Sequence, residues 1–337
     1  MTTIKEIAQQ LNVSASTISR ALNGKKGVSE ALRKQVVNLS EKLGYYPDSN
    51  ATALVKKRVG VLAVVIPRDS DFVFTTPFFP RILLGINRAA NNAGYNILLS
   101  TGVDKDFSSL YHRKLVDGLL VVGHRIDDRN VLNLEHSGIP NVVVPGFPDK
   151  KGPDLISVDG ENIQSVKRAV SYLCSMGHYK IAVITGASNS KYSIERLGGF
   201  RQGMADANIE INEQYLLESD FSVADGSRMM AVLLQMKDRP TAVMAINDAV
   251  AMGAIQEIER WGLKIPQDIS LLAVGGSDVL DGINPPVTSI KIPTIQIGEK
   301  AVELLIKQIA GEPIQKRKII FPTDLIVRES TGICKAE

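Results

Sequence analysis

From residue 59 onward, the sequence alternates between short runs of apolar residues and amphipathic stretches of helical length. Continuous apolar runs of strand length indicate strands that are buried on both faces, which occur in parallel sheets covered by helices. The alternation therefore predicts an α/β body, and its length predicts two such lobes. The expected strands are residues 59–66, 95–99, 116–122, 141–145, 180–185, 242–246 and 269–274. The expected helices include residues 80–92, 164–176, 194–207, 226–236 and 250–261.

The first sixty residues follow a different pattern, which predicts three short helices. Thr3 and Glu6 have the spacing of a capping box at the start of the first helix. Ser14 and Ser29 are suited to cap a second helix over residues 15–22 and a third over residues 30–43. Two short helices joined by a tight turn, with a third packed behind them, form a helix-turn-helix unit.

The basic residues of the chain are concentrated in this head. Residues 1–58 contain ten Lys and Arg side chains against four Asp and Glu, a formal charge of +6 within a total of +3, so the remaining 279 residues sum to −3. A basic head on a mildly acidic body favours a polyanion as the partner of the head alone. A charged surface that is merely solvated would give the same composition.

The second helix has side chains suited to the major groove of DNA. Its expected exposed residues are short except for Arg20, so the helix is able to lie deep in the groove. Arginine bonds a guanine edge with two hydrogen bonds, and Ala15 would contact a thymine methyl group. Hydroxyl groups on and beside this helix suit phosphate oxygens: Ser14, Thr17 and Ser19. A protein-binding module is the alternative for a basic three-helix unit.

Three ungapped segments of the head match a known family: Thr3-Ile4-Lys5-Glu6-Ile7-Ala8, Val13-Ser14-Ala15-Ser16-Thr17-Ile18-Ser19-Arg20-Ala21-Leu22-Asn23-Gly24 and Leu43-Gly44-Tyr45-Tyr46-Pro47. In these segments the chain resembles the lactose/galactose repressor (LacI/GalR) family. The helix and the resemblance together give the expected DNA-binding residues: Thr3, Ser14, Ala15, Ser16, Thr17, Ser19, Arg20, Asn23, Ala51 and Leu54.

The resemblance also implies a hinge helix after Pro47, over residues 48–55, whose leucine enters the minor groove at the operator centre. Inserting such an apolar side chain between two base pairs costs free energy because the bases unstack. The additional protein–DNA contacts that the bent DNA permits offset this cost. This hinge departs from the family at Asp48, usually Asn, and at Thr52, usually Arg. The basic run Lys56-Lys57-Arg58 would restore the charge, and the linker to the first body strand is shorter than usual.

The resemblance continues through the body and covers nearly the whole chain. The matching pieces include Pro77-Phe78-Phe79, Val116-Asp117-Gly118-Leu119, Val158-Asp159, Met176-Gly177-His178, Glu195-Arg196-Leu197-Gly198-Gly199-Phe200, Asp220-Phe221, Ala245-Ile246-Asn247-Asp248, Pro285-Pro286-Val287-Thr288 and Val327-Arg328-Glu329-Ser330-Thr331. They imply a periplasmic-binding-protein-like core of two parallel-sheet lobes joined by three crossovers, with an effector in the cleft.

The expected organisation is an N-terminal all-α helix-turn-helix domain followed by this α/β core. The expected boundaries place the helix-turn-helix domain at residues 1–47, the hinge and linker at 48–58, and the effector-binding and dimerisation core at 59–337. Within the core, the N-lobe is expected over about 59–157 and 290–318, and the C-lobe over about 158–289 and 319–337.

The cleft residues suit a neutral polyol, which needs polar groups for its hydroxyls and an aromatic face for its C–H surface. The expected polar contacts are Asp159, Arg196 and Asn247, and the expected aromatic contacts are Phe78, Phe79 and Phe221. Asp and Asn at strand ends are often turn or helix caps, and Phe221 would equally suit core packing. The family usually carries Val-Gly-Phe-Asp after the late strand, and Gly275 is expected where that Asp would stand.

Several function classes are disfavoured. The chain has no apolar run of about eighteen residues and no apolar signal core, and only Cys174 and Cys334 occur. These features predict a soluble, reduced and cytoplasmic protein, and the expected binding to DNA would associate it with the nucleoid. No cofactor is expected, and His112, His124, His136 and His178 lack metal-ligand spacing. The stretch Val183-Ile184-Thr185-Gly186-Ala187-Ser188 lacks the further glycines of a dinucleotide loop and no Tyr-x-x-x-Lys follows, so an enzyme is not expected.

The sequence therefore predicts a transcriptional regulator, a repressor by preference, that binds a pseudo-palindromic operator as a homodimer, because one head reads only a few base pairs. Its effector is expected to be a sugar or a sugar derivative. Two alternatives stay open: a regulator controlled by a phosphoprotein corepressor, and an exported sugar-binding protein.

The expected role of Arg20 generates a test. We expect Arg20→Ala to lower specific operator affinity by roughly 1–3 kcal/mol and to relax base preference at one position, because a guanine contact is lost. Gel shift against a set of single-base operator variants would measure both effects. An equal loss on all DNA, with base preference unchanged, would place Arg20 on a phosphate instead.

Overall fold

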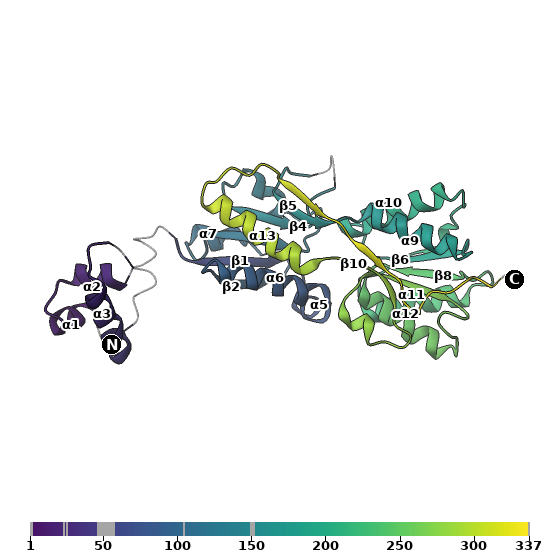
Figure 1. Ribbon diagram of the computed structural model, residues 1–337. Coiled ribbons are helices and arrows are strands. Elements are labelled where there is room, and N and C mark those ends of the chain that lie inside the picture. The colour runs from purple at the N-terminus through teal and green to yellow at the C-terminus, as the bar shows by residue number, and fades with distance from the viewer. Residues whose placement is uncertain are drawn as a thin grey trace. The chain divides into compact units, whose positions relative to one another are not determined.

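The protein was analysed as a computed structural model that describes residues 3–22, 24, 26–45, 58–103, 105–148 and 152–335. The chain divides into two compact units, residues 1–60 and 61–337, and each is considered by itself (Figure 1). Asn23 and the expected hinge at 48–55, with Ala51 and Leu54, lie outside the described residues.

The first unit is the expected three-helix head, with α1 at Ile4–Gln10, α2 at Ala15–Leu22 and α3 at Glu30–Lys42. The capping box is formed: the Glu6 amide donates to Thr3 Oγ1, and the Thr3 amide donates to Glu6 Oε2, each at 3.4 Å. The head has its own small apolar core, in which Ile7, Ile18 and Val36 from the three helices are fully buried. Local capping and one shared core thus define this unit.

The second unit contains two six-stranded sheets, with strand orders β11-β5-β4-β3-β1-β2 and β12-β10-β9-β8-β6-β7. All paired strands are parallel except β10 and β12. The first sheet contains β1 (Val61–Ile66), β2 (Asn96–Thr101), β3 (Gly118–Val122), β4 (Asn141–Val144), β5 (Ser157–Gly160) and β11 (Lys318–Phe321). The second contains β6 (Ile181–Thr185), β7 (Leu216–Glu218), β8 (Ala242–Ala245), β9 (Ser270–Gly275), β10 (Thr288–Lys291) and β12 (Asp324–Ile326). The predicted lobes with parallel sheets are confirmed.

Helices cover both sheets (Figure 1). In the N-lobe, α6 (Phe78–Asn92) packs on α13 (Thr294–Ile309), and α13 contacts β3, β4 and β5. In the C-lobe, α9 (Ile163–Ser175) pairs with α10 (Lys191–Asp206), and α11 (Val223–Gln235) pairs with α12 (Asp248–Arg260). The shorter elements are α5 (Ser70–Thr75), α7 (Ser108–His112), α8 (Arg129–Leu132), η1 (Asn133–His136), η2 (Glu213–Tyr215) and η3 (Asp278–Asp281).

The chain passes between the lobes three times, after β5, after β10 and after β11. These strands move the expected lobe boundaries by a few residues, because β5 and β11 pair with each other in the N-lobe sheet while β10 pairs with β9 in the C-lobe sheet. The N-lobe segments therefore run to Gly160 and from the residues after Lys291 to Phe321.

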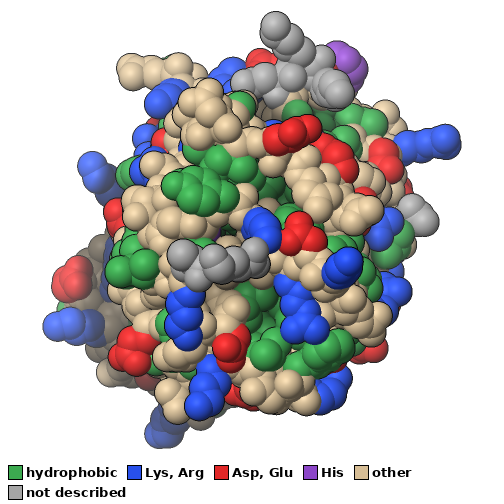
Figure 2. Space-filling model, turned by 90° about the vertical axis from the view of Figure 1, so that its right-hand side faces the viewer, with side chains coloured by type: hydrophobic (Ala, Val, Ile, Leu, Met, Phe, Trp, Pro, Cys, Tyr) green, Lys and Arg blue, Asp and Glu red, His purple; other side chains and the backbone are tan. Residues whose placement is uncertain are grey.

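One face of the second unit carries charges of both signs (Figure 2). Figure 2 views the end of the C-lobe, where Lys and Arg side chains lie among Asp and Glu with hydrophobic side chains scattered between them. Within the described part of the chain, no helix is long and apolar enough to cross a membrane. Both cysteines, Cys174 and Cys334, are free thiols.

Two glycines let α6 and α13 pack backbone to backbone in the N-lobe. A Cβ atom at Gly85 would lie 2.1 Å from the Ile295 carbonyl oxygen, and one at Gly298 would lie 2.5 Å from the Ile82 carbonyl oxygen. Backbone atoms cannot move aside as a side chain can, so this helix pair requires glycine at both positions.

We expect Gly85→Ala to lower the free energy of unfolding by roughly 1–3 kcal/mol, because the added methyl group overpacks the α6–α13 contact. Gly198→Ala is the matched control, since Gly198 also lies in a helix and a Cβ there meets no atom within 4 Å. Alanine there should raise the free energy of unfolding by up to about 1 kcal/mol through helix propensity. Urea denaturation measures both, and equal effects of the two variants would contradict the close contact.

Candidate functional site

The start of α2 in the head carries a cluster of hydroxyl groups. Ser14 Oγ lies 2.7 Å from Ser16 Oγ and 2.8 Å from Thr17 Oγ1, and it accepts a hydrogen bond from the Thr17 amide at 3.1 Å. Ile18 and Ala21 face the core of the head, while Arg20 is exposed. The described members of the expected DNA-binding set are all exposed or half-buried: Thr3, Ser14, Ala15, Ser16, Thr17, Ser19 and Arg20.

A cleft lies between the two lobes of the second unit and has about 810 Å³ of atom-free space, its open mouth included. Its lining comes largely from residues that follow the carboxyl ends of strands, where ligands bind in parallel sheets. The N-lobe contributes Arg68, Phe72, Phe78, Phe79, Arg81, Gly123 and His124, and the C-lobe contributes Ser190, Tyr192, Arg196, Phe221, Asn247, Asp248, Gly275 and Ser277.

Arg196 is a buried guanidinium group in the wall of this cleft. It projects from α10 and is only 6% exposed, with Nε donating to Asn162 Oδ1 at 3.2 Å and Nη1 to the Ile246 carbonyl at 2.6 Å. It also stacks on Tyr192, with 4.9 Å between the guanidinium carbon and the ring centre. Burial lowers the pKa of Arg196, yet an arginine stays charged. Its orientation is fixed before any ligand enters.

The aromatic side chains form a continuous edge-to-face series that crosses the cleft. Phe72 lies 5.8 Å from Phe79 and 6.4 Å from Phe221, and Phe78 lies 5.3 Å from Phe79 and 5.9 Å from Tyr192, measured between ring centres. Because Phe221 and Tyr192 belong to the C-lobe, these contacts join the lobes at the cleft. They also give it the apolar faces that a ring-shaped ligand needs.

Phe221 has a backbone conformation that is unusual for a bulky residue, with φ at +73°. Its carbonyl accepts a hydrogen bond from Asn247 Nδ2 at 3.0 Å, and its ring lies against Gly186, where a Cβ would come within 2.1 Å of the ring. Strained conformations of this kind cluster at functional sites, where the surroundings maintain them.

Asn247 has a structural task as well as a place in the cleft. It is the N-cap of α12, and its Oδ1 accepts from the Val250 amide at 2.7 Å. The amide group therefore both starts a helix and fixes Phe221, which leaves one of its N–H bonds for the cleft.

Asp159 is not among the residues that line the cleft. It lies at the end of β5, 3% exposed, and its Oδ2 accepts from Lys191 Nζ at 2.5 Å. Lys191 also lies 3.4 Å from Glu195. Burial lowers the pKa of Lys191, but the two carboxylates outweigh burial and the pKa lies above its ordinary value; burial raises the pKa of Glu195. The Asp159 carboxylate is thus held by a buried cation instead of facing a ligand.

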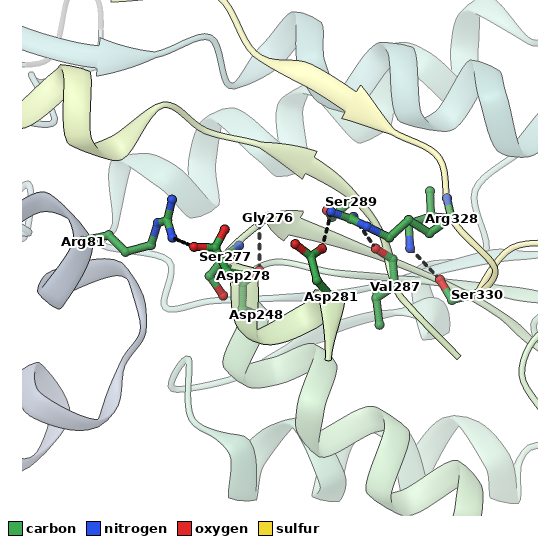
Figure 3. Close-up of polar contacts among 11 residues, drawn as sticks. Arg81, Asp248, Gly276, Ser277, Asp278, Asp281, Val287, Ser289, Arg328 and Ser330 are labelled. Atoms are coloured by element: carbon green, nitrogen blue, oxygen red, sulfur yellow. Dashed lines mark hydrogen bonds and ion pairs between the residues drawn. The ribbon is translucent and has the colours of Figure 1, made fainter. Parts of the chain in front are cut away.

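The loop after β9 has no room for an aspartate at position 275. A Cβ on Gly275 would lie 2.5 Å from Asp248 Oδ1, which accepts from the Gly276 amide at 2.9 Å while Oδ2 accepts from the Ser277 amide at 3.0 Å (Figure 3). With Val274-Gly275 matched to the Val-Gly of the family pattern, the Asp position falls on Ser277, which lines the cleft. Gly275 is therefore not the equivalent of that Asp, and the earlier assignment was wrong.

The same loop connects the lobes. Asp278 accepts from Arg81 of α6 at 2.6 Å, so an ion pair spans the cleft mouth (Figure 3). On the other side, Asp281 pairs with Arg328, which also donates to the Val287 carbonyl at 2.7 Å. The loop is held to the C-lobe by Asp248 and Arg328 and to the N-lobe by Arg81.

Sequence reasoning missed several polar residues of the cleft, above all Arg68, His124, Asp248 and Ser277. Each follows a predicted strand by a few residues, and that position was the signal available in the sequence. Within the described residues, both ring nitrogens of His124, Ser277 Oγ and Thr294 Oγ1 are buried without a hydrogen-bond partner. Burial lowers the pKa of His124 to about 3, so its imidazole is neutral at neutral pH.

Comparisons with known proteins match both the head and the body of this chain to bacterial transcriptional regulators. The family model described as bacterial regulatory proteins, lacI family, matches residues 3–48, and a periplasmic binding protein-like domain matches residues 170–331. The HTH-type transcriptional repressor CytR of Escherichia coli (strain K12) is 31% identical over 334 residues, covering 98% of this chain and 96% of the relative. The HTH-type transcriptional repressor PurR of Photobacterium profundum is 30% identical over 337 residues, covering 98% of each. The solved structure of a transcriptional regulator CelR–cellobiose complex has a TM-score of 0.76 at 29% identity, covering 98% of this chain and 100% of that one.

The buried pair behind the cleft can be tested directly. We expect Lys191→Met to lower the free energy of unfolding by roughly 3–5 kcal/mol, because it leaves the Asp159 carboxylate buried without its cation. Lys300→Met is the control, since Lys300 pairs with Glu303 on the surface and such pairs contribute at most about 1 kcal/mol.

The double variant Asp159→Asn with Lys191→Met removes both charges and should recover much of the loss. Urea denaturation of the four proteins measures these differences. If Lys191→Met behaves like Lys300→Met, the pair is not buried as described.

Proposed function

The chain belongs to the LacI family of bacterial regulatory proteins and is a DNA-binding transcriptional regulator, and we propose that it is a repressor whose operator affinity is set by a small effector in the interlobe cleft. The family is made up of transcriptional regulators and not of enzymes. The observation that carries the proposal is the combination, in one chain, of a basic helix-turn-helix unit with a cleft lined from the strand ends of two sheets.

For the DNA, we assign base reading to Ala15, Ser16 and Arg20, and phosphate binding to Ser19 and to Ser14 and Thr17 of the hydroxyl cluster at the start of α2. That cluster supports the assignment, because it presents several donors beside a helix N-terminus. Two heads of a homodimer would read a pseudo-palindromic operator, with Thr3 and Asn23 completing each contact and with Ala51 and Leu54 in the minor groove. Such a protein acts on the chromosome, so we place it in the cytoplasm with the nucleoid.

For the effector, we assign polar contacts to Arg196 and Asn247 and stacking faces to Phe78, Phe79 and Phe221. The fixed guanidinium of Arg196 and the strained backbone of Phe221 support a preformed site. We assign to Asp159 the role of positioning Lys191, and no longer a direct contact with the effector. A carbohydrate or a derivative suits a cleft that combines aromatic faces with several unpaired polar groups, and the similar CelR has been solved with cellobiose.

Effector control follows from the two-lobed architecture. A ligand that touches Phe78 on one lobe and Arg196 on the other changes the relative stability of two lobe arrangements. The hinge segment at 48–55 is too short for a stable isolated helix, so it would fold only when paired on DNA and act as the element that the effector biases. A typical coupling of about 1–3 kcal/mol would change operator affinity about five- to 150-fold.

A small-molecule effector is favoured over a phosphoprotein corepressor by one observation. His124, Ser277 and Thr294, whose buried polar atoms lack hydrogen-bond partners, line the cleft, which suits a small ligand with several polar groups better than a protein surface. The head disfavours the other alternative, an exported sugar-binding protein.

The assignment of Arg196 generates the test of this function. An operator is first selected from random duplexes with the purified full chain, and a sugar and sugar-derivative panel is screened for release or tightening of that complex. We expect Arg196→Ala to abolish the response to the active compound while ligand-free operator affinity stays within about threefold, roughly 0.7 kcal/mol.

Arg201→Ala is the matched control on the same helix, because Arg201 pairs with Glu213 at the surface. It should respond to the compound as the unmodified chain does. A normal response of Arg196→Ala would remove Arg196 from the effector site, and a chain that selects no specific duplex would contradict the regulator itself.

A further inference from the structure

We propose that the effector is a polyhydroxylated anion, a sugar acid or a sugar phosphate, whose negative charge is bound by Arg68 and Arg196. The inference rests on the proposed function and narrows its effector from carbohydrates in general to charged ones. It is carried by an imbalance of charge in the described lining of the cleft.

The lining holds more cationic than anionic charge that is free to bind a ligand. Its charged side chains are Arg68, Arg81, Arg196 and Asp248. Arg81 is paired with Asp278, and both carboxylate oxygens of Asp248 accept backbone N–H groups of the β9 loop. Among these lining residues, two guanidinium groups therefore lack a carboxylate partner, and no carboxylate remains for the hydroxyl groups of a neutral sugar.

Arg196 gives the stronger evidence for an anionic ligand, because buried charged side chains normally form ion pairs and Arg196 forms none among the described residues. Its hydrogen bonds go to neutral acceptors, the Asn162 amide oxygen and the Ile246 carbonyl. The hydrogen bonds that Arg196 makes to described residues use Nε and Nη1 and not Nη2. The carboxylates of Asp159, Asp248 and Glu195 act on the charge of Arg196 without forming an ion pair with it. A carboxylate or phosphate oxygen in the cleft would accept from the guanidinium directly and place a negative charge in contact with it.

Arg68 presents a second guanidinium group from the opposite lobe. Its Nε donates to the Gly123 carbonyl at 2.7 Å, and its guanidinium carbon lies 6.0 Å from the centre of the Phe72 ring. Burial, followed by the nearby charge of Arg125, lowers the pKa of Arg68 to about 10, so the group is still protonated at neutral pH. Both contacts are to neutral groups and fix the side chain. The nearby carboxylates of Asp127 and Asp128 favour its charged form, and neither forms an ion pair with it.

The remaining unpaired atoms indicate what else the anion carries. His124, neutral and 2% exposed, has one N–H donor and one acceptor nitrogen, and its ring centre lies 4.7 Å from that of Phe147 with the two planes tilted by 37°. Ser277 Oγ and Thr294 Oγ1 also lack partners among the described residues. Groups that both donate and accept suit hydroxyls, and the aromatic faces suit a ring or its C–H surface. A polyhydroxylated compound with one anionic group satisfies all of them.

The test compares neutral compounds with their charged counterparts on the full chain. Thermal unfolding is followed with glucose, gluconate and glucose 6-phosphate, with ribose and ribose 5-phosphate, and with inorganic phosphate, all at one ionic strength. We expect an anionic member to raise the melting temperature and to bind at least tenfold more tightly than its neutral counterpart by calorimetry. The gluconate and phosphate arms separate a carboxylate from a phosphoryl group as the source of charge.

Variants connect the effect to the two arginines. Arg68→Gln should weaken binding of the best anion at least tenfold, and Arg68→Lys, which keeps the charge but loses the planar fork, should give an intermediate value. Arg88→Gln is the control, because Arg88 is exposed on α6 outside the cleft lining, and it should bind as the unmodified chain does.

Three results would overturn the inference: a neutral sugar that binds as well as its anion, undiminished anion binding by both Arg68 variants, or no stabilisation by any anionic probe including phosphate. Selection of a specific duplex is measured on the same preparation. A neutral sugar that releases that duplex would refute the charged effector and leave the regulator standing, whereas failure to select any duplex would contradict the regulator itself.

Discussion

Parallel strand pairing determines where the chemistry of this protein lies. Except for β12, the paired strands of both sheets run in the same direction as their neighbours, so their carboxyl ends open toward the cleft. Each loop that leaves such an end brings its first polar side chains to one place. Arg68 after β1, His124 after β3 and Asn247 after β8 are far apart in the sequence and line one cavity for this reason.

The elements with strong local signals were predictable, and those that depend on distant pairing were not. The capping residues Thr3, Ser14 and Ser29 and the long apolar runs acted locally, so the head and the central strands followed from the sequence. Strands β5, β7, β11 and β12 are short and partly polar, and they become strands only by hydrogen bonding to neighbouring strands that are distant in the sequence. Helix α13 was predictable in principle, since Ile297, Ala301 and Leu305 recur every four residues and are buried.

The site shows the same division. Arg196, Asn247, Phe78, Phe79 and Phe221 all line the cleft, as the resemblance implied. Asp159 does not, because its partner Lys191 comes 32 residues later and no local pattern shows that the two charges meet. The polar atoms left without partners were also beyond sequence reasoning, since a missing hydrogen bond is a property of the folded environment of His124 and Ser277.

The ion pair between Arg81 and Asp278 differs in kind from the other contacts across the cleft. The Asp278 side chain is 70% exposed, whereas Asp248 and Arg196 are buried. Dissolved ions screen exposed charges strongly and buried ones weakly. Ionic strength therefore weakens this ion pair at the rim of the cleft before it affects the buried charges of the interior, and it leaves the aromatic contacts between the lobes in place.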